Sequence, residues 1–414
     1  MVTISRSDDV RQNNRQRVLA VIRRDALLSR TDISAKTGLS AATVSAITSD
    51  LLDEGALIRG QPRQADASDG SAYGRGRPQV ALGLNPDAAL VCAVYFQLNH
   101  LSASLFDYSG TMVSEYTLEI TTKNITVEEI RTALVTCIEG ALGRTLMDTG
   151  SLRHIELGFQ GVTDVVGEQV LWTPICGQTD MPIAEWLSAH FGVSTHVAND
   201  CDMIALALNW RDPEKYGANF AAVLLAHGVG MGLFLRGNII NGTHSSGVEF
   251  GHMTYLPGGA LCRCGNLGCI ESYAGDYAIC RRANGQAESV APSGVMDLPD
   301  LASVLEAAER GEENALTAIE NAGAAIGTGL ASLFAIVDAF PIVLIGRGTS
   351  LFKYMEPSLR VALETAPGEN HNRDLEITCY PDERPLVREG CAIRGLLAFD
   401  TEIAKQRHNS EAAE

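Results

Sequence analysis

Residues 249–271 read EFGHMTYLPGGALCRCGNLGCIE and gather one histidine and three cysteines in a short segment. These four residues are His252, Cys262, Cys264 and Cys269. Three thiolates and one imidazole are a donor set that tetrahedral structural zinc sites use. The glycines between them suit a chain that turns tightly around an ion. Buried apolar cysteines or a disulfide are the alternatives, but the Cys-x-Cys-x4-Cys spacing favours one structural Zn²⁺ per chain as the cofactor.

Composition indicates a cytoplasmic protein of more than one domain. The chain has 414 residues, of which 46% are hydrophobic, enough for two or three domains with sizeable cores. No apolar run approaches the roughly 18 residues of a membrane span, and the N-terminal residues lack the apolar region of a secretion signal. Ten cysteines without such a signal indicate a reducing compartment, where thiols bind metal rather than pair.

The charge is unevenly distributed. The net charge of the chain is −18, which by itself argues against nucleic-acid binding. Residues 1–84, however, hold 12 Lys and Arg against 9 Asp and Glu, a net of +3. The rest holds 20 against 41, a net of −21. A mildly basic end on an acidic body indicates an appended DNA-binding module.

The basic end has the pattern of a helix-turn-helix. Residues 10–25 have the spacing of an amphipathic helix. Thr31 is expected to cap a short helix over 32–37, and Gly38 to end it in a tight turn. A second helix is expected over 41–54, and in this motif the second helix enters the major groove. The residues of that helix and its cap expected at DNA are Ser40, Ala42, Thr43 and Ser45.

Two strands and a polar loop after this helix predict a wing. The loop ends in Gly-Arg-Gly-Arg-Pro over residues 74–78, which resembles an AT-hook. Arg75 and Arg77 are therefore expected in a narrow A·T-rich minor groove, the alternative being an ordinary polar linker. The exposed side of the second helix lacks Arg, Asn and Gln, the usual base readers. We therefore expect specificity to come from the wing and from DNA shape, with a symmetric oligomer on an A/T-rich palindrome.

From about residue 89, strands and helices alternate, which predicts α/β layers with sites at strand ends. The order of motifs in this body resembles the ROK family, named for repressors, open reading frames and kinases. The resemblance covers roughly residues 85–400. Its pieces are Asn199-Asp200, HGVGMG at 227–232, GVEFGH at 247–252, the cysteine motif at 262–271 and IGRG at 345–348.

The resemblance implies a two-lobed, actin-like (ribonuclease H-like) body with a sugar in the cleft. We expect a winged helix-turn-helix over 1–84, a body over 85–405 and a disordered tail over 406–414. Within the body, lobe one is expected over about 85–197 plus a C-terminal helix at 388–405, and lobe two over about 198–387.

The sugar contacts implied by the resemblance are Asn199, Asp200, Glu249, His252 and Glu271. Carboxylates accept short, charge-assisted hydrogen bonds from sugar hydroxyls. A zinc-bound histidine keeps a second ring nitrogen, so His252 can serve metal and sugar together. Two alternatives stay open: Asp200 as a mere helix cap, and Glu271 as a surface charge.

Kinases of this family use the residue at Asp200 as the base and an Asp-x-Gly-Gly-Thr turn to hold ATP phosphates. Here that turn falls at residues 95–99, which read Tyr-Phe-Gln-Leu-Asn. Bulky side chains prevent a close backbone approach to phosphate, so we expect no enzyme activity and regard Asp200 as a vestigial base.

The leading hypothesis is a repressor of sugar uptake or catabolism genes whose body binds a sugar or sugar phosphate as effector. It would act as a homodimer or a dimer of dimers. A sugar kinase with an appended DNA-binding domain is the alternative, and a third possibility is a body whose partner is a protein such as a sugar-transport component.

Overall fold

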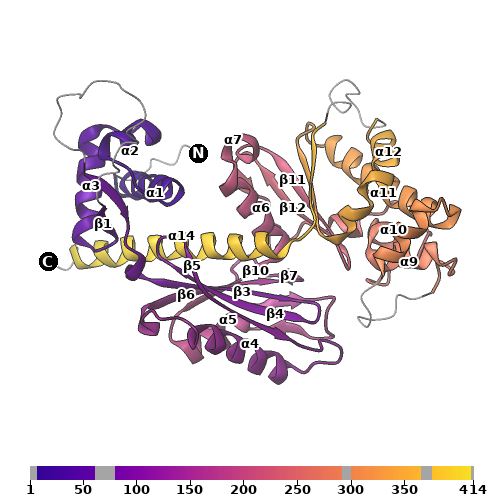
Figure 1. The fold of residues 1–414 in the computed structure, drawn as a ribbon, viewed down its shortest axis with the longest axis horizontal. Helices are drawn as coiled ribbons and strands as arrows, with labels where there is room; N and C mark the ends of the chain where they lie inside the picture. The colour runs from indigo at the N-terminus through magenta and orange to yellow at the C-terminus, as the bar shows by residue number, and fades with distance from the viewer. Residues whose placement is uncertain (1–6, 61–79, 291–299, 365–374, 412–414) are drawn as a thin grey trace.

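The computed structural model describes residues 7–60, 80–290, 300–364 and 375–411 (Figure 1). The N-terminal part, which we call the head, contains α1 (Ser7–Asp25), α2 (Arg30–Thr37), α3 (Ala41–Asp53), β1 (Leu57–Gly60) and β2 (Ala81–Leu84). Strands β1 and β2 pair antiparallel. The predicted helix-turn-helix is confirmed, with a hairpin after it.

Local signals in the sequence explain the head's turns. Helix α2 is capped by Ser29, whose side chain accepts from the Asp32 backbone N–H while Asp32 reaches back to the Ser29 N–H. The predicted cap at Thr31 was wrong, because this reciprocal box starts the helix two residues earlier, at Arg30. Gly38 ends α2 with a φ of 70°, a left-handed conformation that glycine adopts without strain. Ser40 caps α3 by accepting from the Thr43 N–H.

Lobe one is built on a five-stranded sheet in the order β10-β6-β3-β4-β5. Its strands are β3 (Leu90–Gln97), β4 (His100–Asp107), β5 (Met112–Glu119), β6 (Leu152–Phe159) and β10 (Ser194–Asn199). Helices α4 (Val127–Leu142) and α5 (Ile183–Phe191) cover one face, and α14 (Arg384–Glu411) crosses the other. A small sheet of β7 (Val162–Thr163), β8 (Val170–Trp172) and β9 (Thr179–Met181) extends this lobe.

Lobe two is built on a second five-stranded sheet in the order β13-β12-β11-β14-β15. Its strands are β11 (Phe220–Leu225), β12 (Val229–Leu235), β13 (Asn238–Ile239), β14 (Ile342–Ile345) and β15 (Ile377–Tyr380). Its helices are α6 (Asp200–Arg211), α7 (Pro213–Tyr216), α8 (Glu271–Ala274), α9 (Asp276–Ala283), α10 (Leu301–Glu309), α11 (Glu313–Phe334) and α12 (Phe352–Leu363). Short 3-10 turns in this lobe are η3 (Phe250–His252) and η4 (Arg347–Leu351). Two further turns, η1 (Pro86–Ala88) and η2 (Thr149–Ser151), precede β3 and β6 of lobe one.

The last helix is longer than the one expected at 388–405. It begins at Arg384, whose backbone N–H donates to the Asp382 side chain, and it continues to Glu411. Residues 406–411 are therefore helical, within the stretch expected as a disordered tail. The sheet of lobe one also includes β10 up to Asn199, so the chain passes to lobe two at Asn199-Asp200.

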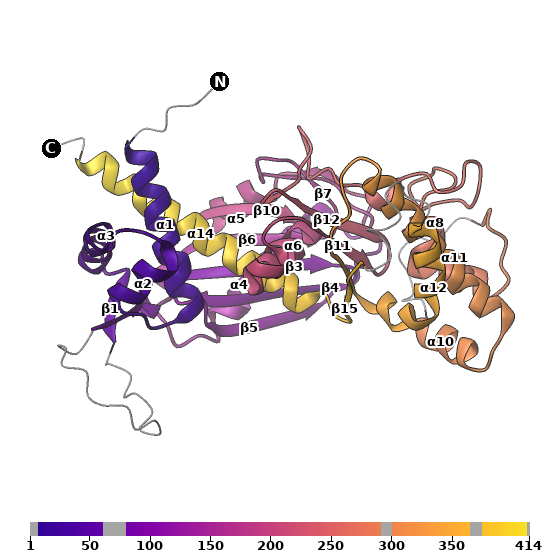
Figure 2. The ribbon, with the colours of Figure 1, turned by 90° about the horizontal axis from the view of Figure 1, so that it is seen from above.

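The head is packed firmly on the body. Figure 2 shows α1 crossing α14, and Leu396 and Phe399 of α14 share one buried core with the head. Arg23 of α1 forms a bidentate ion pair with Asp400, at 2.8 and 3.2 Å, and both side chains are almost fully buried. The hydroxyl of Tyr108, from lobe one, donates to the same carboxylate at 2.7 Å. Head, lobe one and α14 therefore meet at one buried carboxylate.

Candidate functional site

The four predicted metal ligands lie together. Their donor atoms all fall within 4.8 Å of one another. The Cys262 Sγ lies 3.7 Å from the His252 Nδ1, and the Cys264 Sγ lies 3.8 Å from the Cys269 Sγ. Donors about 2.3 Å from a tetrahedral Zn²⁺ would be separated by about 3.8 Å. Donor set and spacing both fit zinc.

The fold of the cysteine segment depends on a glycine. Gly268 has a φ of 83°, and its carbonyl accepts from the backbone N–H groups of Tyr255 and Leu256. A Cβ at Gly268 would overlap the Leu256 carbonyl oxygen. The segment therefore folds back on itself only with glycine here, and this close return brings Cys269 toward the other ligands.

One open cleft brings together the five residues that the resemblance implied as sugar contacts. Asn199 and Asp200 enter it from the junction of β10 and α6, and Glu249, His252 and Glu271 enter it from the cysteine segment. Sequence reasoning did not assign other residues to this lining, among them Gln160, Gly161, Trp172, Ser246 and Arg263. Several polar groups that converge in one cleft are typical of a small-molecule site.

His252 lies between the cysteine cluster and the cleft. The His252 Nδ1 faces Cys262, while its Nε2 lies 3.7 Å from the Glu249 Oε2 at the cleft. Glu271 is buried, and its Oε2 accepts from the Val229 backbone N–H at 3.2 Å. Its Oε1 accepts from the Tyr277 hydroxyl at 3.3 Å. The burial of Glu271 excludes the alternative of a surface charge.

Asn199, rather than Asp200, caps α6. Its Oδ1 accepts from the backbone N–H groups of Cys201 and Asp202, and its Nδ2 donates to the Gly161 carbonyl at 2.7 Å. Asp200 is buried at the wall of the cleft and accepts from the Tyr95 hydroxyl at 3.4 Å. Burial raises the pKa of Asp200 from 3.8 to about 7, and the nearby Glu383 charge adds to the rise.

The segment at the expected phosphate turn is a tight hairpin. Strand β3 runs through Gln97 and β4 begins at His100, with Asn99 at a φ of 56°. Phe96 is buried and stacks on Phe159 with 4.8 Å between ring centroids. The Leu98 N–H donates to the Gln160 side chain at 3.1 Å. At the position of the expected phosphate turn, this chain therefore has stacked aromatic rings and a backbone N–H that is already hydrogen-bonded.

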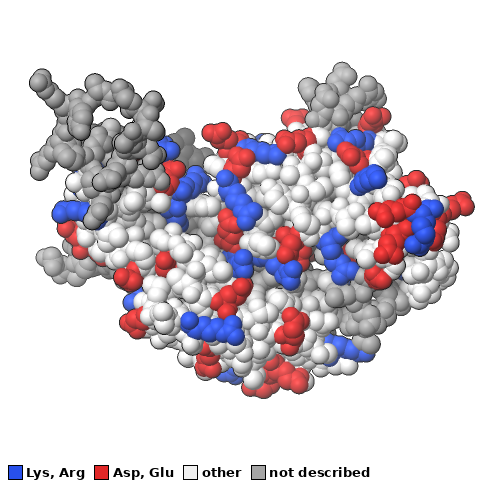
Figure 3. Space-filling view, viewed as in Figure 1, with Lys and Arg blue, Asp and Glu red and all other residues white. Residues whose placement is uncertain are grey.

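The predicted DNA contacts divide between described and undescribed parts of the chain. Ser40, Ala42 and Ser45 are exposed along one side of α3, and Thr43 is half-buried beside them. Arg75 and Arg77 lie outside the described residues. On the face drawn in Figure 3, acidic side chains gather over α10, at the far end of the body from the head. This distribution agrees with the charge asymmetry of the sequence.

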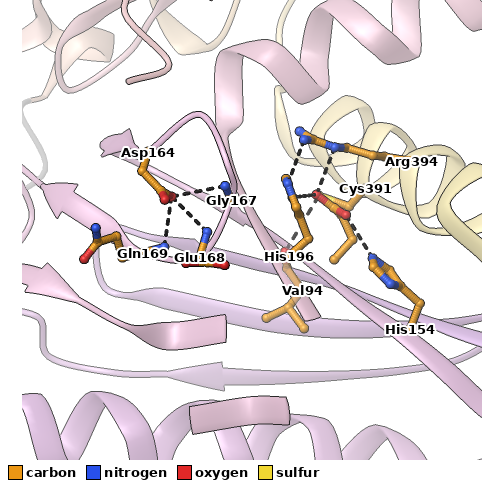
Figure 4. A network of polar contacts seen from close by, with 10 residues as sticks. Val94, His154, Asp164, Gly167, Glu168, Gln169, His196, Cys391 and Arg394 are labelled. Carbon is orange, nitrogen blue, oxygen red and sulfur yellow. Dashed lines mark hydrogen bonds and ion pairs between the residues drawn. The ribbon is translucent and has the colours of Figure 1, made fainter. Parts of the chain in front are cut away.

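A buried polar network joins α14 to lobe one and was missed by sequence reasoning (Figure 4). Glu156 is 1% exposed and contacts the His154 Nε2 at 3.1 Å and the His196 Nδ1 at 3.0 Å. Arg394 of α14 donates to the other nitrogen of His196 at 3.0 Å. Burial alone would raise the pKa of Glu156, but the Arg394 charge and the histidine bonds outweigh it and lower the value to about 2. The network fixes α14 on the sheet.

A helix-turn-helix head is therefore joined to a two-lobed α/β body whose cleft adjoins a cluster of three cysteines and one histidine. A sequence profile of the ROK family matches residues 96–379, and a profile of winged helix-turn-helix DNA-binding domains matches residues 11–58. The chain belongs to the ROK family.

Relatives of known name cover nearly the whole chain. A putative xylose repressor of Caldicellulosiruptor sp. is 25% identical over 405 residues, covering 94% of this chain and 98% of that relative. The DNA-binding transcriptional dual regulator NagC of Escherichia coli is 24% identical over 363 residues, covering 87% of each.

Solved structures share the fold. A ROK family transcriptional regulator, a homologue of the E. coli Mlc protein, superposes with a TM-score of 0.72 at 20% identity, covering 94% of this chain and 99% of that one. A ROK family glucokinase from Streptomyces griseus, in complex with glucose and AMPPNP, has a TM-score of 0.60 at 21% identity. The match covers 99% of the glucokinase chain but 74% of this chain, so about a quarter of this chain has no counterpart in the glucokinase. Within the described residues, no helix has the length and apolar character to cross a membrane.

Proposed function

We propose that this protein is a DNA-binding transcriptional repressor of sugar uptake or catabolism genes, with a sugar or sugar derivative as effector. The proposal rests on one observation: the helix-turn-helix head and the cleft of the body belong to one packed structure. The head presents the exposed side of α3, and the body gathers Asp200, Glu249 and Glu271 in one cleft. The named relatives, a putative xylose repressor and the transcriptional dual regulator NagC, match this chain over 98% and 87% of their own lengths and support the same function.

The kinase alternative is disfavoured by the hairpin at residues 95–99. Phosphoryl transfer depends on positioning and on neutralising phosphate charge. The Phe96–Phe159 stack and the paired Leu98 N–H offer no such surface at this turn. The Tyr95 hydroxyl also engages Asp200, the residue that would act as base. We therefore propose a sensor rather than an enzyme, with kinases as relatives by fold.

Zinc is the cofactor we propose, held by His252, Cys262, Cys264 and Cys269. Bound there, it would supply structure rather than chemistry, fixing the segment that carries Glu249 and Glu271. We further propose a homodimer or dimer of dimers on an A/T-rich palindrome, and a cytoplasmic location. The ten cysteines, all free, support a reducing compartment.

A panel of free sugars and sugar phosphates is the direct test. The panel contains xylose, N-acetylglucosamine and glucose, each as the free sugar and as its phosphate. We expect at least one of these compounds to raise the Tm of the protein by several degrees, because a ligand that binds only the folded state stabilises it. The same panel with ATP and Mg²⁺ should give no ATP consumption above background in a coupled assay. Sugar-dependent ATP turnover would establish the kinase alternative. Binding of a sugar-transport protein with no response to any compound would establish a protein partner instead.

Arg77→Ala tests the wing. We expect weaker operator binding at every salt concentration, together with a salt dependence of log K reduced by about 1, because one phosphate-neutralising charge is lost. A gel-shift or anisotropy titration at several salt concentrations measures both. Arg310→Ala, which removes an exposed arginine at the distal end of the body, should leave affinity and slope unchanged. Equal affinities and slopes for Arg77→Ala and the native protein would show that the wing stays outside the groove.

A further inference from the structure

Helix α6 connects the cleft with the head. Its N-terminal residue Asp200 lines the cleft, and Trp210 lies one residue before its C-terminal end. These two residues are about 15 Å apart along the helix axis. The helix packs closely on lobe two, since a Cβ at Gly232 of β12 would overlap the Cys201 carbonyl oxygen, and on its other side it packs against α14. We therefore expect α6 to follow lobe two as one rigid element when the cleft opens or closes.

The same helix crosses α14 at a backbone contact near its cleft end. A Cβ at Gly390 of α14 would overlap the Met203 carbonyl oxygen. From this crossing, Asp200 lies about 4.5 Å along the axis in one direction and Trp210 about 10.5 Å in the other. A small tilt of α6 about the crossing would therefore displace Trp210 more than twice as far as Asp200.

Two consecutive residues of α1 contact different parts of the body. Arg23 pairs with Asp400 of α14, while the Arg24 guanidinium lies over the Trp210 ring at 4.5 Å from its centroid. A groove borders this second contact, lined by Trp210, Arg23 and Ile393 among others. The groove gives the indole room to shift, whereas the buried Arg23–Asp400 pair holds the head to α14.

We propose that Trp210 is a positioning residue that passes movement of lobe two to the head, with α6 as a lever that pivots where Met203 meets Gly390. This inference rests on the proposed function, since it concerns how effector binding changes operator binding. When a sugar engages Asp200, the lever shifts Trp210 against Arg24, and the head rotates about the Arg23–Asp400 pair. The two ends of α6 are thus coupled through one rigid element with a defined pivot.

Trp210→Ala tests the lever. The DNA is a duplex selected from a random library with the native protein, and the sugar is xylose or, if xylose does not bind, the panel member with the largest Tm shift. We expect unchanged sugar affinity by calorimetry. The ratio of operator Kd with and without sugar should fall toward 1 by about 2- to 5-fold, the size of an exposed cation–π contact. Trp210→Phe, which keeps a ring under the guanidinium, should restore most of the native ratio.

Arg24→Ala removes the same contact from the head side and should reduce the ratio by the same factor. The double variant should reduce it no further, because both single changes break one contact. Arg144→Ala is the matched control, since Arg144 lies over the Tyr116 ring at the same 4.5 Å in lobe one, remote from the head. It should keep the native ratio.

A native ratio in Trp210→Ala, or a loss of the same size in Arg144→Ala, would overturn the lever. Failure of the native protein itself to select DNA, or to bind any sugar of the panel, would instead overturn the proposed function and the lever with it. The two failures are therefore distinguishable from the native protein alone.

Discussion

Cys264→Ser is expected to lose its zinc and the response to sugar together. A serine hydroxyl stays protonated and is a poor ligand, so the site would keep three of its four donors. Structural zinc in small domains contributes about 10–16 kcal/mol of apparent binding free energy, so its loss should release the segment that carries Glu249 and Glu271. Zinc content by mass spectrometry should fall from about one ion per chain to near zero, and the sugar-induced rise in Tm should disappear.

Cys280→Ser is the matched control for that experiment. Cys280 is also a free, partly buried cysteine of lobe two, but it lies on α9 and outside the four-residue cluster. Its variant should keep both zinc and the sugar response. Full zinc content in Cys264→Ser would refute the assignment of the ligands. Zinc loss with an intact sugar response would show that the metal does not support the cleft.

Asp200→Asn is expected to separate stability from sugar binding. Burial raises the pKa of Asp200 from 3.8 to about 7. Between those values the folded protein holds a proton that the unfolded chain releases, so the free energy of unfolding falls as pH rises. The full cost, up to about 4 kcal/mol, is present above pH 7 and absent below pH 4. Denaturant unfolding should therefore find the variant more stable than the native protein at pH 8, with the difference shrinking toward pH 5.

Although Asp200→Asn should stabilise the protein, it should weaken sugar binding. At pH 8, where Asp200 is charged, the amide loses the charge-assisted acceptor, so the affinity for the bound member of the panel should fall by about 10- to 100-fold. Asp202→Asn is the control, because Asp202 is also buried with a pKa raised to about 7, mainly by burial, but lies outside the lining of the cleft. It should gain stability at pH 8 and keep its sugar affinity. Unchanged affinity in Asp200→Asn would remove Asp200 from the proposed sugar contacts.

Local signals made the head predictable, and also the clustering of the four residues that we propose as metal ligands. The turn at Gly38 and the cap at Ser40 depend on residues within a few positions of one another, and so does the Cys-x-Cys-x4-Cys spacing. Where several polar residues adjoin, tertiary and local contacts decide which of them caps the helix. Ser29 was preferred to Thr31 because Asp32 stands three residues after it, and Asn199 to Asp200 because its amide also reaches Gly161.

Contacts made by tertiary folding were not predictable in this way. Tyr95 reaches Asp200 because β3 and β10 both flank β6, although 105 residues separate the two in sequence. His196 and Arg394 are 198 residues apart and meet only because α14 returns across the sheet. Gln160 follows a strand that the sequence identified, but its hydrogen bond to the Leu98 backbone depends on the pairing of β3 with β6. Such convergence requires the strand order, which a single sequence does not specify.

Because α14 returns to pack against the head, the head cannot be exchanged between related proteins without also exchanging the C-terminal part of α14. Leu396, Phe399 and Asp400 complete the packing of residues that lie more than 370 positions earlier, such as Arg23. A chimaera that exchanges only the first 84 residues would break the Arg23–Asp400 pair and expose part of the shared core. Exchange of sensors between such regulators should therefore transfer both ends of the chain as one unit.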